Sequence, residues 1–175
     1  LGLILKDHIR VLLGSPLVVG WALLVGGIAI LAIERVIKPG VDSGVGRLPL
    51  RQALGVGVAQ CLSMIPGVSR SGATIMGALA MGVGRKTAAE FSFFLAIPTM
   101  LGASTLELID FGDEIAKGAG RVGWDEIAIG FAVSFIVALV VIRAFVAYVS
   151  RRGFAPFAWY RILIGIFAIA WLSLR

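Results

Sequence analysis

The ten residues "IPGVSRSGAT", 65–74, interrupt two strongly apolar stretches. They bring together a proline, two glycines, an arginine and three hydroxyl side chains. Proline and glycine are poor helix formers, and an arginine at membrane depth costs about 3 kcal/mol or more unless it meets a partner. The stretch therefore predicts a break in membrane-embedded helix that surrounds a polar site.

The composition indicates a lipid environment. Of the 175 residues, 59% are hydrophobic and 15% are charged, and the mean hydropathy is +0.99. Soluble domains carry roughly a quarter charged residues. The formal charge of +6 then reports membrane topology, and nucleic acid is not an expected partner. The single cysteine, Cys61, excludes an internal disulfide. We expect one all-α integral membrane domain over residues 1–175, a fragment of a longer chain.

Hydropathy divides the chain into four full spans and two short pieces. Residues 17–33, 87–108, 127–149 and 157–174 approach the ~20 residues that cross a bilayer. Residues 51–65 and 72–83 are shorter and flank the break. This pattern favours a re-entrant helix-loop-helix hairpin over residues 51–84, which enters and leaves on one face. The alternative is one long helix kinked at Pro66. Irregular backbone at membrane depth must be buried in protein or line a wet cavity, so the hairpin predicts a cavity.

The distribution of basic residues agrees with the hairpin. If the hairpin returns to its own side, one face holds ten cations: Arg35, Lys38, Arg47, Arg51, Arg85, Lys86, Arg143, Arg151, Arg152 and Arg161. The other face holds five: Lys6, Arg10, Lys117, Arg121 and Arg175. The positive-inside rule makes the first face cytoplasmic and places an acidic loop, from Asp110 to Glu126, outside.

The residues of the break match an anion. The fork of Arg70 suits phosphate or carboxylate, and Ser69, Ser71 and Thr74 add hydroxyl donors. A half-helix beginning near Gly72 would point free N–H groups into the break, and Gly67 and Gly72 would let the backbone approach a ligand.

These features predict a phosphate-sized site, but alternatives remain open. Arg70 could instead form a structural ion pair with Glu90 or Glu107. Glu90 could also bind a metal ion, or lie at headgroup level without a role.

A longer stretch resembles a known family. "QCLSMIPGVSRSGATIMGALAMGVGRKTAAEFSFFLAIPTMLGA", residues 60–103, is similar to the second signature region of the bacterial undecaprenyl pyrophosphate phosphatases, the bacitracin-resistance family. The flanks "LVVGWALLVGGIAILAIER" and "FAPFAWYRILIGI", residues 17–35 and 154–166, resemble the same family. The resemblance covers nearly the whole chain.

The resemblance implies a multi-pass enzyme of the bacterial inner membrane with an inverted repeat. Its substrate would be a polyprenyl diphosphate, dephosphorylated to recycle the lipid carrier of peptidoglycan synthesis, with a divalent cation, Mg²⁺, as cofactor. Arg70, Ser69 and Ser71 would be catalytic, and Gly67, Gly72 and Thr74 would join them in binding the diphosphate. The family's first signature, which carries the expected metal ligands, is absent from this sequence, so we expect the chain alone to be inactive.

Two further expectations stay open at this level. Broken helices also bind anions in membrane transporters, so a lipid-phosphate flippase or anion carrier is the alternative function. Glycine-rich segments, at Gly26-Gly27 and residues 77–84, would allow close helix contacts within one chain or in a homodimer.

Overall fold

The computed structural model describes residues 12, 14–38, 40–116 and 123–174, with the backbone alone for residues 110–116. Within these residues the chain is all-helical, which confirms the predicted class. The α-helices are α2 (Pro16–Val36), α3 (Leu50–Gln60), α4 (Arg70–Ala80), α5 (Arg85–Ala116), α6 (Trp124–Arg152) and α7 (Ala155–Ser173), with short 3-10 turns at Val45–Arg47 and Cys61–Met64.

Four helices in the described part are long and apolar enough to cross a membrane: α2, α5 over Arg85–Ile109, α6 and α7. They match the four predicted full spans. The predicted acidic loop is shorter than expected, because α5 continues to Ala116 and α6 begins at Trp124. Aspartate and glutamate are tolerated in helices, and Glu126 stabilises the start of α6 by accepting a hydrogen bond from Gly123 N at 2.9 Å. Lys6, Arg10, Lys117, Arg121 and Arg175 lie outside the described residues.

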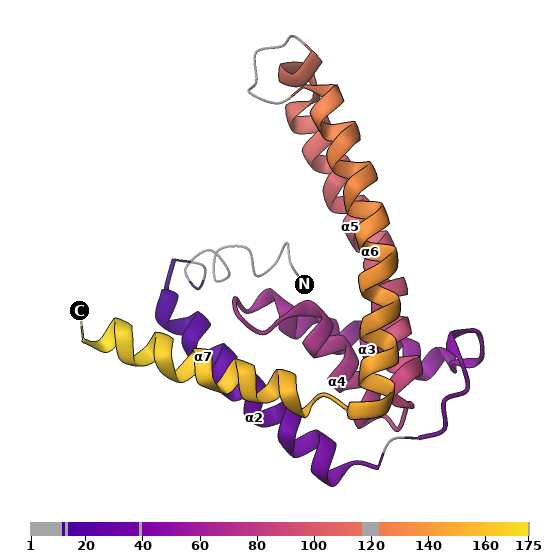
Figure 1. Ribbon diagram of the computed structural model, residues 1–175, viewed down its shortest axis with the longest axis vertical. Coiled ribbons are helices and arrows are strands. Elements are labelled where there is room, and N and C mark those ends of the chain that lie inside the picture. The colour runs from indigo at the N-terminus through magenta and orange to yellow at the C-terminus, as the bar shows by residue number, and fades with distance from the viewer. Residues whose placement is uncertain (1–11, 13, 39, 117–122, 175) are drawn as a thin grey trace.

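Helices α2 and α7 lie side by side across the base of the molecule (Figure 1). Small residues make this approach possible. A Cβ added at Gly165 of α7 would lie 2.8 Å from Leu24 N, and one at Gly27 of α2 would lie 2.8 Å from Ala158 O. The glycine at 27 therefore serves a contact within this chain, as small residues do in packed membrane helices.

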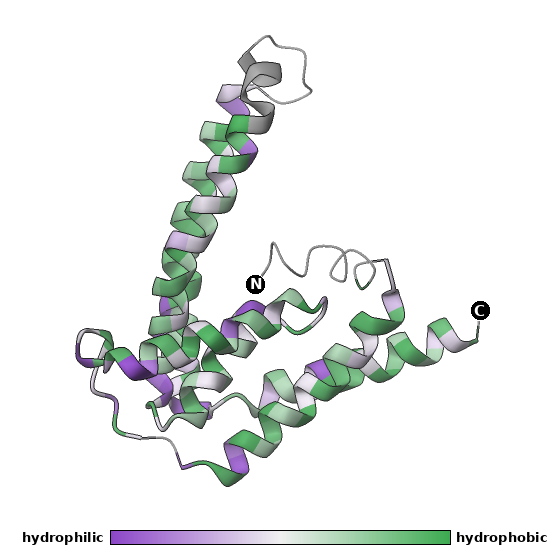
Figure 2. Ribbon diagram, turned by 180° about the vertical axis from the view of Figure 1, so that it is seen from behind, coloured by the Kyte–Doolittle hydropathy of each residue, from purple (hydrophilic) through white to green (hydrophobic). Residues whose placement is uncertain are grey.

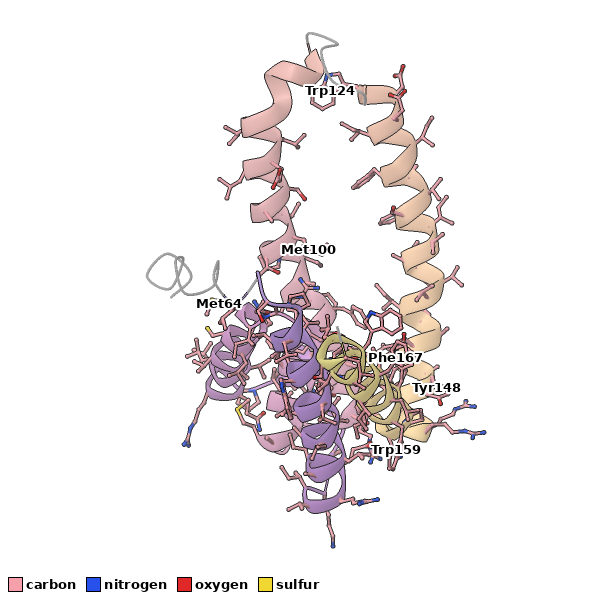
Figure 3. All side chains as sticks on the ribbon, turned by 90° about the vertical axis from the view of Figure 1, so that its left-hand side faces the viewer. Met64, Met100, Trp124, Tyr148, Trp159 and Phe167 are labelled. Carbon is pink, nitrogen blue, oxygen red and sulfur yellow. The ribbon has the colours of Figure 1, made fainter. Side chains whose placement is uncertain are left out.

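Helices α5 and α6 form an arm that projects from this base (Figure 1). The rings of Phe93 and Phe145 pack edge to face with centroids 5.8 Å apart, and Figure 3 shows the two helices diverging beyond the base. Hydrophobic residues cover most of the arm (Figure 2). A helix that is apolar all round needs a membrane or a protein interior, and no residue in the most apolar window of α6 is buried in this structure.

The predicted break is present between α3 and α4. Helix α3 ends at Gln60, a 3-10 turn follows, and α4 begins only at Arg70. Each helix has 11 residues, and the two pack against each other. A single long helix kinked at Pro66 is therefore wrong, because its two halves would point away from each other.

One carboxylate joins four helix ends. Glu34, in the last turn of α2, contacts Arg85 at the start of α5 at 3.2 Å. The same oxygen accepts a hydrogen bond at 2.8 Å from Phe154 N, between α6 and α7. The end of α2, the start of α5, the end of α6 and the start of α7 consequently meet at one level. The segment that contains α3 and α4 leaves this level and returns to it.

Candidate anion-binding site

The loop before α4 is held in an unusual backbone conformation. Ser69 has a φ of 72° and Gly67 has a φ of 90°. The left-handed region suits glycine but is uncommon for serine. Ser69 caps α4, because its Oγ accepts a hydrogen bond from Gly72 N at 3.2 Å. The hydroxyl of Ser71 lies 3.3 Å from that of Ser69. Two hydroxyls thus sit together at the positive end of a helix.

A second arginine, Arg161 of α7, reaches the same loop. Its Nη2 donates to Gly67 O at 2.8 Å and to Ala22 O at 3.3 Å. Its Nε is buried without a hydrogen-bond partner among the described residues. Gly26 leaves room for this side chain, because a Cβ there would lie 2.5 Å from Nη2. The guanidinium is therefore held by Ala22 of α2 and Gly67 of the loop, and its Nε–H remains available to a ligand.

Arg161, Ser69 and Ser71 line one cavity of about 210 Å³, the serine cavity. The other lining residues are Ile30, Gly72, Ile75, Met76, Phe145, Phe154, Phe157 and Tyr160. A second cavity of about 240 Å³ adjoins it and shares Ile30, Gly72, Met76 and Arg161. Every other residue that lines this second cavity is apolar. The described lining of both cavities contains no carboxylate, so Arg161 and the helix end make the site electropositive.

Arg70 points to a different neighbour. Its Nη1 donates to Thr99 Oγ1 of α5 at 3.1 Å, and it is not among the lining residues of the serine cavity. The described residues give it no ion pair: Glu90 contacts Lys86 at 3.9 Å instead. The two arginines therefore flank the start of α4, with Arg161 on the α2–α7 side and Arg70 on the α5 side.

Thr74 is the most buried of the predicted site residues. Its exposed fraction is 1%. Its hydroxyl lies 3.0 Å from Arg70 O, 3.2 Å from Ser71 O and 2.6 Å from Ser92 Oγ. These contacts tie the first turn of α4 to α5. Contact between Thr74 and a ligand stays a prediction.

The described residues offer no ligand set for a metal ion. No group of three or more histidine, cysteine, aspartate or glutamate side chains comes together in the described part of the chain. Glu90, the predicted candidate, has a lysine as its ionic neighbour. These residues alone do not fit a divalent cation.

The sequence interpretation missed Arg161 as a site residue. It counted Arg161 among the cations of the basic face, although this arginine lies in the second turn of an apolar helix. A charged residue inside a span is itself a signal of function. Its partner could not be read from the sequence, because Gly67 is 94 positions away.

Comparison with known proteins agrees with the motif. Three relatives are each named Undecaprenyl-diphosphatase. Those of Novosphingobium aromaticivorans and Rhizorhabdus wittichii are 71% and 55% identical, over 100% of this chain and 65% and 64% of their own lengths. That of Sphingopyxis alaskensis is 57% identical, over 98% of this chain and 63% of its own length. The chain thus spans just under two thirds of these curated relatives. Residues 1–167 match the family described as bacitracin resistance protein BacA, and the chain belongs to that family.

Proposed function

We propose that this chain supplies the diphosphate-binding part of a membrane phosphatase that converts undecaprenyl diphosphate to undecaprenyl phosphate. The observation that carries the proposal is the electropositive cavity where Ser69, Ser71 and Arg161 meet the start of α4. The relatives' printed name supplies the substrate.

The chemistry of the reaction suits this site. Breaking a phosphoric anhydride moves negative charge onto phosphoryl oxygens, and catalysis is mostly positioning and charge stabilisation. Arg161 and Arg70 would hold the diphosphate from two sides, and the serine hydroxyls would donate to its oxygens. Gly72 and Gly67 would let the backbone come close, and the first N–H groups of α4 would add dipoles aimed at the developing charge.

The neighbouring apolar cavity supports a lipid substrate. It begins at Gly72 and Arg161 and is otherwise lined by side chains such as Ile33, Leu62 and Val68. A diphosphate held between the serines and Arg161 would have its first isoprene units beside this cavity. We propose that the cavity takes the start of the polyprenyl tail.

The same proposal places α3 and α4 as a re-entrant hairpin in the bacterial inner membrane, within an inverted-repeat architecture. Two observations support the hairpin. Neither helix is long enough to span a bilayer, and the Glu34 junction returns the chain to its starting level. We assign the divalent cation, Mg²⁺, and the group that attacks phosphorus to the part of the relatives that this chain does not cover. Formation of a homodimer stays a prediction that native mass spectrometry would test.

The test is phosphate release from a polyprenyl diphosphate. The chain is joined to the N-terminal segment of the Novosphingobium relative, purified in detergent, and assayed with Mg²⁺. Arg70→Ala and Arg161→Ala are compared with Arg152→Ala, which removes the same charge outside the cavities. A lost charged hydrogen bond costs about 1.5–3 kcal/mol, so each site variant should lose roughly 10- to 150-fold in kcat/KM.

The outcomes separate the candidate functions. No release from the unchanged protein, with transport of the lipid across vesicles, would favour a carrier that uses the broken helix without hydrolysis. Release that survives both substitutions would place the diphosphate elsewhere and overturn the proposal.

A further inference from the structure

A second polar cavity lies between α5 and α6, away from the serine cavity. Its volume is about 440 Å³. The lining residues are Lys86 and Glu90 of α5 and Ile142, Arg143, Val146, Ala147, Ser150 and Arg151 of α6. Three cations face one carboxylate, so the cavity carries a net positive charge. It shares no residue with either cavity of the candidate site.

The charge of Arg143, which no described carboxylate pairs, favours an anion in this cavity. It lies nine residues before the end of α6, in a helix with a mean hydropathy of 2.6 in its most apolar window. At 1.5 Å per residue, that is about 13 Å inside the helix end. Neither Arg143 nor Arg151 has an ion pair among the described residues, and the one ion pair at the cavity, between Lys86 and Glu90, spans 3.9 Å. An exposed guanidinium beside the apolar part of a membrane helix is costly unless an anion or the headgroup region meets it.

The lining is polar along one stripe and apolar beside it. Arg143, Ser150 and Arg151 recur at the spacing of one helix face, and Ile142, Val146 and Ala147 continue the surface with aliphatic groups. The Ser150 hydroxyl donates to Val146 O at 2.7 Å, which leaves its oxygen free to accept. Inorganic phosphate would use the cations alone, whereas a phospholipid would use both surfaces.

The cavity also lies at a membrane interface. It is formed by the start of α5 and the last turns of α6, the level at which Glu34 joins the helix ends. Figure 3 shows Tyr148 and Trp159 at this end and Trp124 at the far end of the arm. Tyrosine and tryptophan mark the two interfaces of a bilayer. Trp124 and Tyr148 are 24 residues apart, about 36 Å along the helix, which matches a bilayer's thickness.

We propose that the groove between α5 and α6 is a binding site for an anionic glycerophospholipid. The phosphodiester lies between Arg143 and Arg151, and an acyl chain follows Ile142 and Val146. Basic pockets between membrane helices are a recurrent form of headgroup recognition. The site is independent of the proposed enzymatic function, so neither proposal depends on the other.

The test measures lipid binding by the full-length protein. Native mass spectrometry after delipidation counts bound phosphatidylglycerol, phosphatidylethanolamine and phosphatidylcholine, and thermal unfolding is followed with each lipid and with inorganic phosphate. The double variant Arg143→Gln/Arg151→Gln is compared with Arg47→Gln/Arg152→Gln, which removes the same charge outside the groove. Arg143→Lys/Arg151→Lys keeps the charge and guards against loss of folding.

We expect phosphatidylglycerol to bind and to raise the unfolding temperature more than either net-neutral lipid. The glutamine pair in the groove should weaken this binding roughly tenfold to thirtyfold, and the control pair should weaken it less than threefold. Equal losses in the two pairs, equal binding of all three lipids, or the same stabilisation by inorganic phosphate alone with its loss in the groove glutamine pair would each overturn the proposal.

Discussion

Gly26→Ala tests the positioning of Arg161 without touching a charge. The added Cβ would lie 2.5 Å from Nη2, 3.2 Å from Cζ and 3.4 Å from Nε of Arg161. The guanidinium must therefore move by about 1 Å, since non-bonded carbon contacts favour 3.5–4 Å. A shift of that size breaks the 2.8 Å hydrogen bond to Gly67 O. The guanidinium is the far end of a flexible side chain, so the helix backbone can stay in place.

The change in stability is a balance of two terms. Alanine gains about 0.5–1 kcal/mol over glycine in a helix interior. Losing a charged hydrogen bond costs about 1.5–3 kcal/mol. The protein should therefore lose about 0.5–2.5 kcal/mol of unfolding free energy, which leaves most molecules folded. Phosphate release should fall by tenfold or more, because a misplacement of about 1 Å is large for a positioned group.

The matched control is Gly130→Ala in α6, where a Cβ meets no atom within 4 Å. Chemical unfolding followed by circular dichroism measures stability, and the polyprenyl diphosphate assay measures activity. The control should be at least as stable as the unchanged protein and fully active. If Gly26→Ala matches the control in both measurements, the Arg161–Gly67 contact does not position the site.

Three further changes test the other contacts. Glu34→Gln weakens the partly buried ion pair with Arg85, whose Nε is already buried without a described partner, and losing a hydrogen bond to a charged group costs about 1.5–3 kcal/mol. Thermal unfolding should show this loss, and Arg85→Met in the same protein should recover part of it. Thr74→Val leaves the Ser92 hydroxyl unpaired at about 1–3 kcal/mol, whereas Thr74→Val/Ser92→Ala should recover most of that stability; equal stability of the two variants would contradict the hydrogen bond. Ser69→Gly relieves a left-handed backbone worth about 1–3 kcal/mol and removes the hydroxyl, so the protein should become more stable and less active, and lower stability would show that the cap outweighs the strain.

The spans and the break could be predicted because each depends on local composition. Pro66 and Gly67 stand together with three hydroxyl residues, a combination that disfavours helix, and runs of about 20 apolar residues need a bilayer. The same local reasoning identified Ser69 and Ser71 at the start of α4. Contacts between residues far apart in the sequence could not be predicted in this way. Arg70 meets Thr99, 29 positions away, rather than a carboxylate, because the crossing of α4 and α5 sets which side chain faces it.

The meeting of four helix ends at Glu34, the Glu34 junction, could not be predicted from the sequence either. A glutamate at the end of a span is most often at headgroup level without a role, and nothing near position 34 indicates Arg85 or Phe154. The junction depends on where four helix ends come together, which is a property of the whole packing. Backbone N–H groups at helix starts lack partners within the helix, so Phe154 N at the start of α7 is free to donate to this carboxylate, and Arg85 at the start of α5 adds a positive charge beside it.

Arg161 and the broken helix supply each other with hydrogen-bond partners. A break between helices leaves backbone carbonyls without their helical partners, and Gly67 O is one of them. An arginine in an apolar helix needs hydrogen-bond acceptors, which carboxylates or backbone carbonyls can supply. The carbonyls of Gly67 and Ala22 meet this need, whereas a carboxylate would neutralise the guanidinium and close the site to an anion. Pairing with neutral carbonyls keeps the full positive charge beside the start of α4. The loop and the arginine thus satisfy each other's polar groups, and the charge that remains supports the proposed binding of an anion beside α4.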